Sequence, residues 1–376
     1  MIDFFLHNYK KLKFFYSTIK NIDKINSKIP DYIFYSENKS YLKYSYPFLK
    51  LLSEIYPNKV YYISSDKDDK ILDLNIKNIC IGSGFLRQYF FKVIKAKNFF
   101  LTTTDLGNNI LKKNKNVKNY IYYFHSPVST LKQYMNGAFD NYDTIICNGD
   151  YQVNELKKSE TIRGTIKKNF IKSGYLYFDY LKERINKNVN SNEILIAPSW
   201  NINEINYMNR NLEELIEEIL SRDFNVRFRP HPENIKRSND FINQLKKKFY
   251  SKNFILDESV ENKYAMEKAK CLITDNSGIA IEYLLLFRKP ILYFDDIDKV
   301  HNKEFDKYNI KMIEDEVKDI FGYKFGKKEI KNIHSIINDS ILNFKIKEKQ
   351  IDEFINKNFY NFGSTAKYLK NYFSNY

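Results

Sequence analysis

The sequence has few cysteines, no long apolar run and no dinucleotide-binding fingerprint. Its three cysteines, Cys80, Cys147 and Cys271, lie in apolar segments and include no Cys-x-x-Cys pair. We therefore expect small core residues in a reducing cytoplasm, without a disulfide framework or a structural zinc site. No stretch of about 18 uncharged apolar residues occurs, so no membrane-spanning helix is expected. The glycine turn at residues 81–84 is not a Gly-x-Gly-x-x-Gly motif and predicts no dinucleotide site.

The N-terminal segment is basic and aromatic. Its apolar cluster at residues 4–6 is too short for the core of a signal peptide, and lysines interrupt the residues after it. No secretory signal is therefore expected in residues 1–21. Aromatic and aliphatic side chains there alternate with Lys10, Lys11 and Lys13. This composition suits a helix that lies on an anionic bilayer, and it suits equally a helix that packs on its own domain.

The net charge of +15 does not by itself indicate a nucleic-acid partner. Lysine, asparagine, isoleucine, tyrosine and phenylalanine are abundant together, which is the residue usage of an AT-rich genome, and the lysines are spread along the chain. The sequence carries no RNA-binding signature and no helix with base-reading spacing, so we expect no nucleic acid among the partners. An anionic membrane surface fits the charge better, since each nearby Lys or Arg contributes roughly 1 kcal/mol of attraction.

Short apolar runs alternate with longer amphipathic segments along almost all of the 376 residues. This alternation is typical of an α/β fold in which helices cover parallel sheets, and the length suits two domains of similar size. We expect two Rossmann-like, doubly wound parallel-sheet domains. The expected strands are residues 32–35, 60–63, 79–81, 99–103, 120–124 and 144–147 in the first half, and 194–197, 226–228, 254–256, 271–274 and 291–294 in the second.

A polar, asparagine-rich stretch at residues 182–192 marks the boundary between the two domains. We place the N-terminal domain at residues 1–181 and the C-terminal domain at residues 182–343. Residues 344–376 are expected to form two helices separated near residues 361–363.

One motif places cationic side chains at a strand end in the second half, where doubly wound sheets bind ligands. The strand at residues 226–228 runs into Arg229, Pro230, His231 and Pro232. The prolines stiffen the turn, and a guanidinium beside an imidazole suits phosphate or pyrophosphate oxygens. The alternative is a structural turn with a solvated arginine.

A second motif joins a strand to a helix. The strand ends at Thr274 and is followed by Asp275, Ser277 and Gly278. A side chain here caps a helix whose first N–H groups are unpaired, and such a helix start binds phosphate readily. Gly278 would let an anion approach the backbone, and the carboxylate of Glu282 would reach ribose hydroxyls. Capping of a purely structural helix is the alternative, but two such loops at adjacent strand ends favour a binding site.

A third candidate lies in the first half. The strand at residues 120–124 is followed by His125, Ser126 and Pro127, again in the order strand, histidine, proline. At a strand end, a neutral imidazole could take a proton from an acceptor hydroxyl. The alternative is a histidine with a structural role, whose ring forms hydrogen bonds within the protein.

The first strand of the second half also ends in polar residues. Ala197 is followed by Pro198, Ser199 and Trp200, which is the only tryptophan of the chain. Backbone N–H groups, a hydroxyl and an indole suit contact with a phosphate or a nucleobase. A tryptophan of the core is the alternative.

The order and spacing of these motifs resemble the CDP-glycerol glycerophosphotransferase family of teichoic-acid and capsule enzymes. The resemblance covers the motifs at residues 124–127, 197–200, 228–232, 274–277 and 289–291. It implies a GT-B-like fold, with the active site in the cleft between two Rossmann-like domains. The acceptor would bind on the N-terminal domain and the nucleotide on the C-terminal one, with the terminal helices packing back on the N-terminal domain.

The resemblance also implies roles for single residues. His125 would be the catalytic base, with Ser126 and Pro127 on the acceptor side, and His231 would be catalytic by stabilising the leaving CMP. The donor nucleotide and its pyrophosphate would be held by Pro198, Ser199, Arg229, Pro230, His231, Thr274, Asp275, Ser277, Gly278 and Glu282. No metal is required by this chemistry, because arginine, histidine and a helix dipole can carry the leaving charge.

The sequence departs from the family pattern at three places. Ser126 follows His125 where the family has a glycine, and Gly278 follows Ser277 where the family has a second serine. The family's Gly-x-Pro-Arg-x-Asp stretch corresponds to residues 174–179, which contain no arginine. The missing arginine leaves the donor open to another polyol or to a sugar nucleotide.

We therefore expect a transferase that moves a phospho-polyol, glycerol phosphate or similar, from a CDP-activated donor to a hydroxyl of a cell-surface glycan or lipid-linked acceptor. It would need no cofactor and would work in the cytoplasm or at the inner face of the bacterial cell membrane. The alternatives are a GT-B glycosyltransferase, an enzyme similar to UDP-N-acetylglucosamine 2-epimerase, and a non-catalytic scaffold. The presence of His125, Arg229 and His231 in one chain argues against the scaffold.

Overall fold

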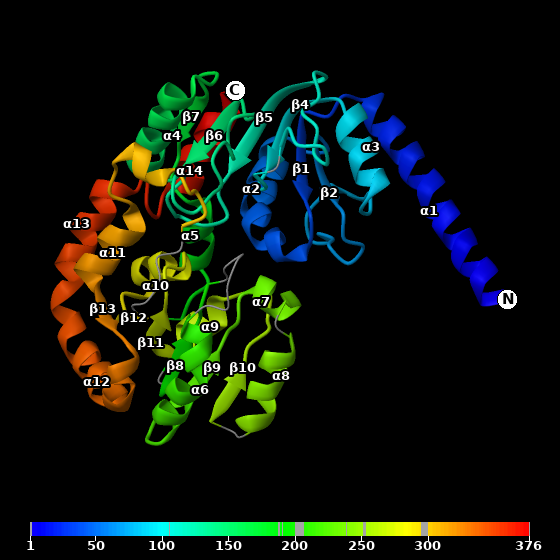
Figure 1. Cartoon of the computed structure of the whole chain (residues 1–376). Coiled ribbons are helices and arrows are strands. Elements are labelled where there is room, and N and C mark those ends of the chain that lie inside the picture. The colour runs from blue at the N-terminus through cyan, green and yellow to red at the C-terminus, as the bar shows by residue number, and fades with distance from the viewer. Residues whose placement is uncertain are drawn as a thin grey trace. The chain divides into compact units, whose positions relative to one another are not determined.

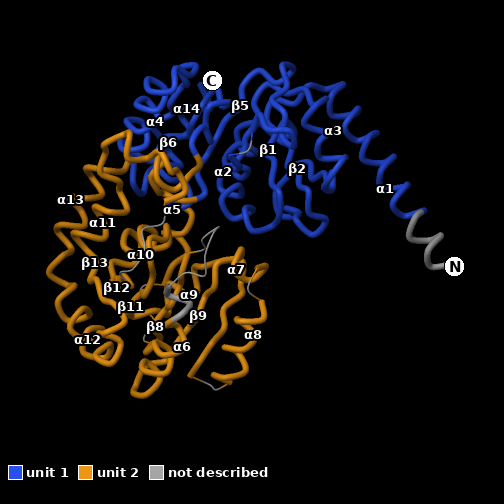
Figure 2. Tube along the Cα trace, viewed as in Figure 1, with its two compact units in different colours: residues 1–125, 136–179, 360–376 blue, residues 126–135, 180–359 orange. Residues whose placement is uncertain are grey.

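The chain folds into two units, each built on its own parallel sheet (Figures 1 and 2). The computed structural model describes residues 2–104, 106–186, 189, 191–199, 207–237, 239–250, 253–294 and 300–375. Unit 1 comprises Met1–His125, Asn136–Asp179 and Tyr360–Tyr376, and unit 2 comprises Ser126–Met135 and Tyr180–Phe359. The prediction of two Rossmann-like α/β domains is therefore confirmed.

Within the described residues, the sheet of unit 1 has seven parallel strands in the order β3-β2-β1-β4-β5-β6-β7. The strands are β1 Tyr32–Ser36, β2 Val60–Ser64, β3 Lys77–Cys80, β4 Ala96–Leu101, β5 Val117–Tyr123, β6 Thr144–Cys147 and β7 Asn169–Lys172. The helices are α1 Ile2–Asn26, α2 Leu42–Ile55, α3 Phe85–Val93, α4 Asp150–Arg163 and α14 Thr365–Ser374, and α5 Leu176–Lys182 begins in unit 1 and ends in unit 2.

Aromatic side chains form much of the core of unit 1. Phe34 stacks on Phe100 with ring centroids 4.3 Å apart, and both belong to one buried cluster with Phe48 of α2 and with Leu369 and Phe373 of α14. Successive side chains of a strand point to opposite faces, so a sheet covered on both faces has continuous apolar runs. This is why these strands were predictable from short uninterrupted apolar segments.

The sheet of unit 2 has, among the described residues, six parallel strands in the order β10-β9-β8-β11-β12-β13. The strands are β8 Glu193–Ile196, β9 Asn225–Phe228, β10 Phe254–Leu256, β11 Ala269–Thr274, β12 Ile291–Phe294 and β13 Gly322–Phe325. The helices are α6 Tyr207–Leu220, α7 Pro232–Arg237, α8 Asn239–Lys248, α9 Lys263–Lys268, α10 Ile279–Phe287, α11 Ile313–Phe321, α12 Ile333–Phe344 and α13 Glu348–Asn358.

The predicted strands all occur, with ends shifted by a few residues, but the sequence analysis missed β7 and β13. Each of these two strands lies at an edge of its sheet and contributes one buried residue, while its other residues are exposed or half-buried. Polar residues at their exposed positions, such as Lys172 and Lys324, break the continuous apolar run, so the signal used for the other strands is missing.

The segment Ser126–Met135 belongs to unit 2, although the predicted boundary placed it in the N-terminal domain. Lys132 is buried and forms an ion pair with Asp315 at 2.8 Å. Ser129 donates to Glu314 Oε1 from its backbone N at 2.9 Å and from Oγ at 3.1 Å. Burial raises the pKa of Glu314. These contacts with the start of α11 hold the segment on unit 2.

The last two helices belong to different units. Helix α13 contacts α10 in unit 2, whereas α14 contacts α2 in unit 1 (Figure 2). The turn between them has positive φ at Asn361 (42°) and Gly363 (80°), which glycine and asparagine adopt at low cost. The polypeptide therefore returns to unit 1 for its last 17 residues, Tyr360–Tyr376.

We predict that unit 1 depends on α14 for its stability. Replacing Phe373 by alanine should lower the free energy of unfolding by about 3–5 kcal/mol, because it removes a fully buried ring from the main cluster. The change is read from urea unfolding followed by circular dichroism. Lys367→Ala, an exposed position on the same helix, should change it by less than about 0.5 kcal/mol. Equal unfolding midpoints for the two variants would contradict the prediction.

Candidate active site

The strand order of unit 2 reverses between β8 and β11, because β9 and β10 lie on one side of β8 and the remaining strands on the other. In doubly wound sheets, ligands bind beyond the carboxyl ends of the strands at this reversal. Pro198 and Ser199 follow β8, and Asp275, Ser277 and Gly278 follow β11. The structure therefore brings two of the predicted motifs to the position where this topology binds ligands.

Asp275 joins the two loops at this position. Ser199 donates to its carboxylate from the backbone N and from Oγ, each at 2.8 Å. The preceding residue, Thr274, donates from Oγ1 to the carbonyl oxygen of Ala197 at 2.6 Å. All three polar side chains are buried. These contacts show that Asp275 and Thr274 hold the two loops together, a role that their prediction as donor-binding residues did not include.

Helix α10 begins directly after this loop. Gly278 is its N-cap residue, and the backbone N of Ser277 donates to the carbonyl oxygen of Asp275 at 2.7 Å. A helix start carries unpaired N–H groups and a partial positive charge, so this end of α10 suits a phosphate group. Glu282 lies one turn into α10, where it is buried and accepts a hydrogen bond from Asn262 Nδ2 at 2.9 Å. Asn262 thus fixes the carboxylate that was predicted to meet the ribose.

Arg229 leaves β9 at the same edge of the sheet. Its backbone N donates to the carbonyl oxygen of Ile196, the last residue of β8, at 2.9 Å. Its guanidinium donates to Ser259 Oγ at 3.0 Å and to Ser259 O at 2.8 Å, and Nη1 lies 3.2 Å from Asp257 Oδ1. The sequence analysis missed Asp257 and Ser259. Both follow β10, so the strand-end rule that found Arg229 would have found them too.

The hydrogen bonds of His231 indicate which ring nitrogen carries the proton. The backbone N of Glu233 donates to His231 Nδ1 at 3.1 Å, so a neutral ring carries its hydrogen on Nε2. Pro232 is the first residue of α7, a position that proline favours. Asn234, also on α7, donates from Nδ2 to the carbonyl oxygen of Ser199 at 3.2 Å. The histidine and the buried Pro230 before it are therefore tied to the loop after β8.

His125 lies in unit 1, just after β5. Its Nδ1 is 3.1 Å from Oγ1 of Thr102, which follows β4, and the ring is half-buried. The rings of Tyr41 and Tyr44 lie 5.5 and 5.9 Å from it, centroid to centroid. When Thr102 accepts the hydrogen bond, Nδ1 carries the proton and Nε2 becomes the basic nitrogen. The arrangement can therefore support the base predicted for this residue.

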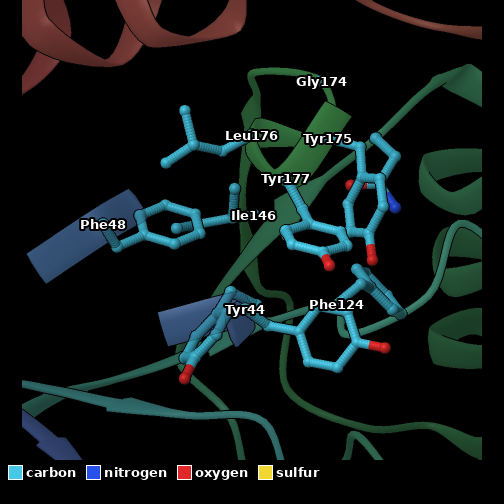
Figure 3. A pocket seen from close by; sticks show the side chains of 10 residues that line it. Tyr44, Phe48, Phe124, Ile146, Gly174, Tyr175, Leu176 and Tyr177 are labelled. Atoms are coloured by element: carbon cyan, nitrogen blue, oxygen red, sulfur yellow. The ribbon is translucent and has the colours of Figure 1, made fainter. Parts of the chain in front are cut away.

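A small aromatic cavity of about 10 Å³ lies in unit 1 (Figure 3). Tyr44 lines it and also contacts the histidine ring, while Phe48, Tyr175 and Tyr177 form other parts of the wall. The volume corresponds to about one water molecule. The cavity is a packing feature of the aromatic core and has no room for a substrate.

Ser126 and Gly278, the sites of two departures from the family pattern, meet in unit 2. A Cβ atom on residue 278 would lie 2.1 Å from Ser126 Oγ and 2.9 Å from Val128 Cγ1. Ser126 and Val128 occupy the space where a side chain would start, which gives the glycine a packing reason that the prediction of a closely approaching anion did not include. The structure also places Ser126 and the buried Pro127, predicted on the acceptor side, in the unit that carries the donor motifs.

Two further residues of the predicted motifs were considered for the site on sequence grounds. Trp200 lies outside the described residues. Lys289 donates from Nζ to the carbonyl oxygens of Glu267 at 3.0 Å and Ala269 at 2.7 Å, and burial lowers its pKa to about 8. In the part of the chain that the structure describes, no group of three or more His, Cys, Asp or Glu is arranged to hold a metal ion.

Comparison with known protein families gives a match to most of the chain. The family described as CDP-Glycerol:Poly(glycerophosphate) glycerophosphotransferase matches residues 93–313. This range includes every candidate residue of the site, from His125 to Glu282. No curated protein is similar enough in sequence to give a match.

Several solved structures are similar in fold. The wall teichoic acid polymerase TagF has a TM-score of 0.61 and 17% identity over 96% of this chain and 97% of that chain. The S. aureus MnaA-UDP co-structure has a TM-score of 0.59 and 12% identity over 93% and 97%. The Methanocaldococcus jannaschii UDP-GlcNAc 2-epimerase with UDP-GlcNAc and UDP has a TM-score of 0.56 and 13% identity over 92% and 99%. These similarities confirm the predicted GT-B-like fold class.

We predict that residues 126 and 278 tolerate a side chain at only one of the two positions. Gly278→Ser should lower the free energy of unfolding by about 1–3 kcal/mol, because its side chain would overlap Ser126 Oγ. The φ of residue 278 is −61°, so the backbone itself adds no strain.

The matched test is a double-mutant cycle followed by thermal unfolding. Ser126→Gly alone should have a small effect, and Ser126→Gly combined with Gly278→Ser should recover at least half of the lost stability. Recovery stays incomplete because Val128 remains in place. Additive effects of the two substitutions would show that the side chains do not compete for this space.

Proposed function

This chain belongs to the CDP-glycerol:poly(glycerophosphate) glycerophosphotransferase family and is an enzyme of that class, and we propose that its donor binds beyond the carboxyl ends of the strands of unit 2. The observation that carries the proposal is that Arg229 and His231 follow β9 while α10 follows β11, so that they flank the end of β8 at the same edge of the sheet, inside the matched range. One of the TagF structures similar to this chain was soaked with CDPG. We therefore take CDP-glycerol as the donor and a hydroxyl of a cell-surface glycan or lipid-linked molecule as the acceptor.

The proposed reaction is an in-line transfer at phosphorus. The acceptor oxygen bonds to the phosphorus that carries the glycerol, the bond from this phosphorus to the bridging oxygen of CMP breaks, and CMP leaves. Negative charge grows on the leaving phosphate, where the Arg229 guanidinium, the Nε2–H of His231 and the helix start after Ser277 can stabilise it. Ser199 and Pro198 border the same position at the end of β8.

His125 is the proposed base of this reaction. Its Nε2 would take the proton of the acceptor hydroxyl, while Thr102 Oγ1 accepts a hydrogen bond from Nδ1–H and stabilises the charged ring that forms. The aromatic rings of Tyr41 and Tyr44 limit the orientations of the imidazole.

We predict that His231→Ala weakens binding of CDP-glycerol by about 10–100-fold, measured by titration calorimetry. A hydrogen bond to a charged group contributes about 1.5–3 kcal/mol, which corresponds to this range. Lys236→Ala is the matched control, because Lys236 is an exposed cation on the same helix. It should change the affinity by less than about threefold.

The same titration separates the donor classes. CDP-glycerol and CMP should bind more tightly than UDP-GlcNAc and UDP. A preference for uridine nucleotides would replace the proposed donor with a sugar nucleotide. Equal effects of His231→Ala and Lys236→Ala would remove His231 from the donor site.

We propose that α1 brings the enzyme to the inner face of the cell membrane. No helix in the described ranges is both long and apolar enough to cross a bilayer. Tyr9, Leu12 and Tyr16 are 66%, 55% and 66% exposed, and their spacing places them on one face of α1. Phe15 instead stacks on Phe85 of α3, with ring centroids 6.2 Å apart.

Basic side chains accompany this exposed apolar face. The exposed lysines of the helix are Lys10, Lys11, Lys13, Lys20 and Lys24. Apolar side chains that enter the headgroup region, together with lysines that face anionic lipids, form the combination that binds a helix to a bilayer surface. An acceptor linked to lipid would then lie on the same surface as the enzyme.

We predict that Leu12→Asp reduces binding to vesicles of phosphatidylglycerol and phosphatidylcholine at least tenfold in a cosedimentation assay. The substitution removes an apolar side chain and places a negative charge at the anionic surface. Ser17→Asp adds the same charge at an exposed position away from this face and should have a smaller effect. Lack of vesicle binding by the unaltered protein would contradict the membrane proposal.

A further inference from the structure

We infer that Asp257 is a positioning residue of the donor site, which holds the guanidinium of Arg229 in the orientation that meets the leaving phosphate. The inference rests on the proposed function and adds to it a residue outside all of the recognised motifs. Asp257 follows β10, the strand beside β9, and its backbone N donates to the carbonyl oxygen of Phe228 at 2.8 Å. It is therefore fixed directly next to the residue that precedes Arg229.

The side chain of Asp257 organises a set of acceptors around the guanidinium. Its Oδ1 lies 3.2 Å from Arg229 Nη1 and accepts hydrogen bonds from the N and Oγ of Ser259. Ser259 in turn accepts from Nη1 through Oγ at 3.0 Å and from Nη2 through its carbonyl oxygen at 2.8 Å. Both terminal nitrogens of the guanidinium, Nη1 and Nη2, thus donate hydrogen bonds, which fixes the plane of the group.

Burial makes this arrangement unlike an ordinary surface ion pair. The side chains of Arg229 and Asp257 are 12% and 6% exposed. Taking both charges out of water is costly, and a pair at such a site needs further hydrogen bonds to offset the loss. Ser259 supplies these bonds. A guanidinium held in this way loses little additional freedom when it binds an anion, and such preorganisation is what stabilises charge in a transition state.

A second arginine supplies the matched control. Arg227, two residues before Arg229 on β9, donates from Nε to Glu193 Oε2 at 2.7 Å, and its Nη1 lies 3.8 Å from Asp257 Oδ2. Asp257 therefore contacts both arginines, whereas the ion pair of Glu193 is with Arg227. A change at Glu193 disturbs the buried charges of the sheet and leaves the acceptors around Arg229 in place.

The test is steady-state kinetics with CDP-glycerol. Asp257→Ala should lower kcat at least tenfold and change KM by less than about threefold, because the guanidinium loses its orientation toward the leaving group while the rest of the donor site is intact. Asp257→Asn keeps an oxygen acceptor for Arg229 and Ser259 and should retain most of kcat. Glu193→Gln should leave kcat within about twofold of the unaltered enzyme.

A double variant distinguishes positioning from a general loss of structure. In an Arg229→Ala background, Asp257→Ala should lower kcat no further, because the residue it positions is already absent. An additional loss in this background, or an equal loss in Glu193→Gln, overturns the inference. Ser259→Ala provides a second probe of the same acceptors and should lower kcat in the same direction if Asp257→Ala folds poorly.

The outcome also separates this inference from the proposed function. If Arg229→Ala leaves turnover and donor binding unchanged, the proposed donor site itself is wrong. If Arg229→Ala abolishes turnover while Asp257→Ala and Ser259→Ala leave kcat unchanged, the proposed donor site is supported and only the positioning role of Asp257 is wrong.

Discussion

The candidate active site of unit 2 depends on the carboxylate of Asp275. Strands β8 and β11 are neighbours in the sheet but far apart in the sequence, and their ladder ends near Thr274. Beyond that point, Asp275 accepts both the N–H and the O–H of Ser199. Hydrogen bonds to a buried charged group are strong, and leaving such a group without partners is costly. The end of β8 and the start of α10 are therefore held together at the point where the strand order reverses.

The remaining parts of the site are attached to this pair of strands one after another. The backbone of Arg229 bonds to the end of β8, and Asn234 bonds from α7 to the loop after β8. Asp257 connects the end of β10 to the site. Its backbone N donates a hydrogen bond to β9, and its carboxylate forms an ion pair with the Arg229 guanidinium. Four adjacent strands thus contribute loops to one edge of the sheet. This is how residues spread over a long stretch of sequence come to one edge of the sheet, where we propose that the diphosphate binds.

The sequence predicted the features that depend on local patterns. Strands covered on both faces gave continuous apolar runs, and strand ends bearing His125, Arg229 or Ser277 stood out because polar residues and prolines come directly after such runs. The edge strands β7 and β13 lack this signal because they are partly exposed. The role of Asp257 and the competition of Ser126 with Gly278 for one space could not be predicted, because each depends on a contact between segments that are remote in the sequence.

The most direct test of the proposed donor site is a crystal structure of the protein with CDP-glycerol bound. We expect the diphosphate beyond the carboxyl ends of β8 and β11, within hydrogen-bond distance of the Arg229 guanidinium, of His231 Nε2 and of a backbone N–H at the start of α10. A diphosphate bound elsewhere on the chain, or bound there without contact to Arg229 and His231, would show that the donor site is wrong.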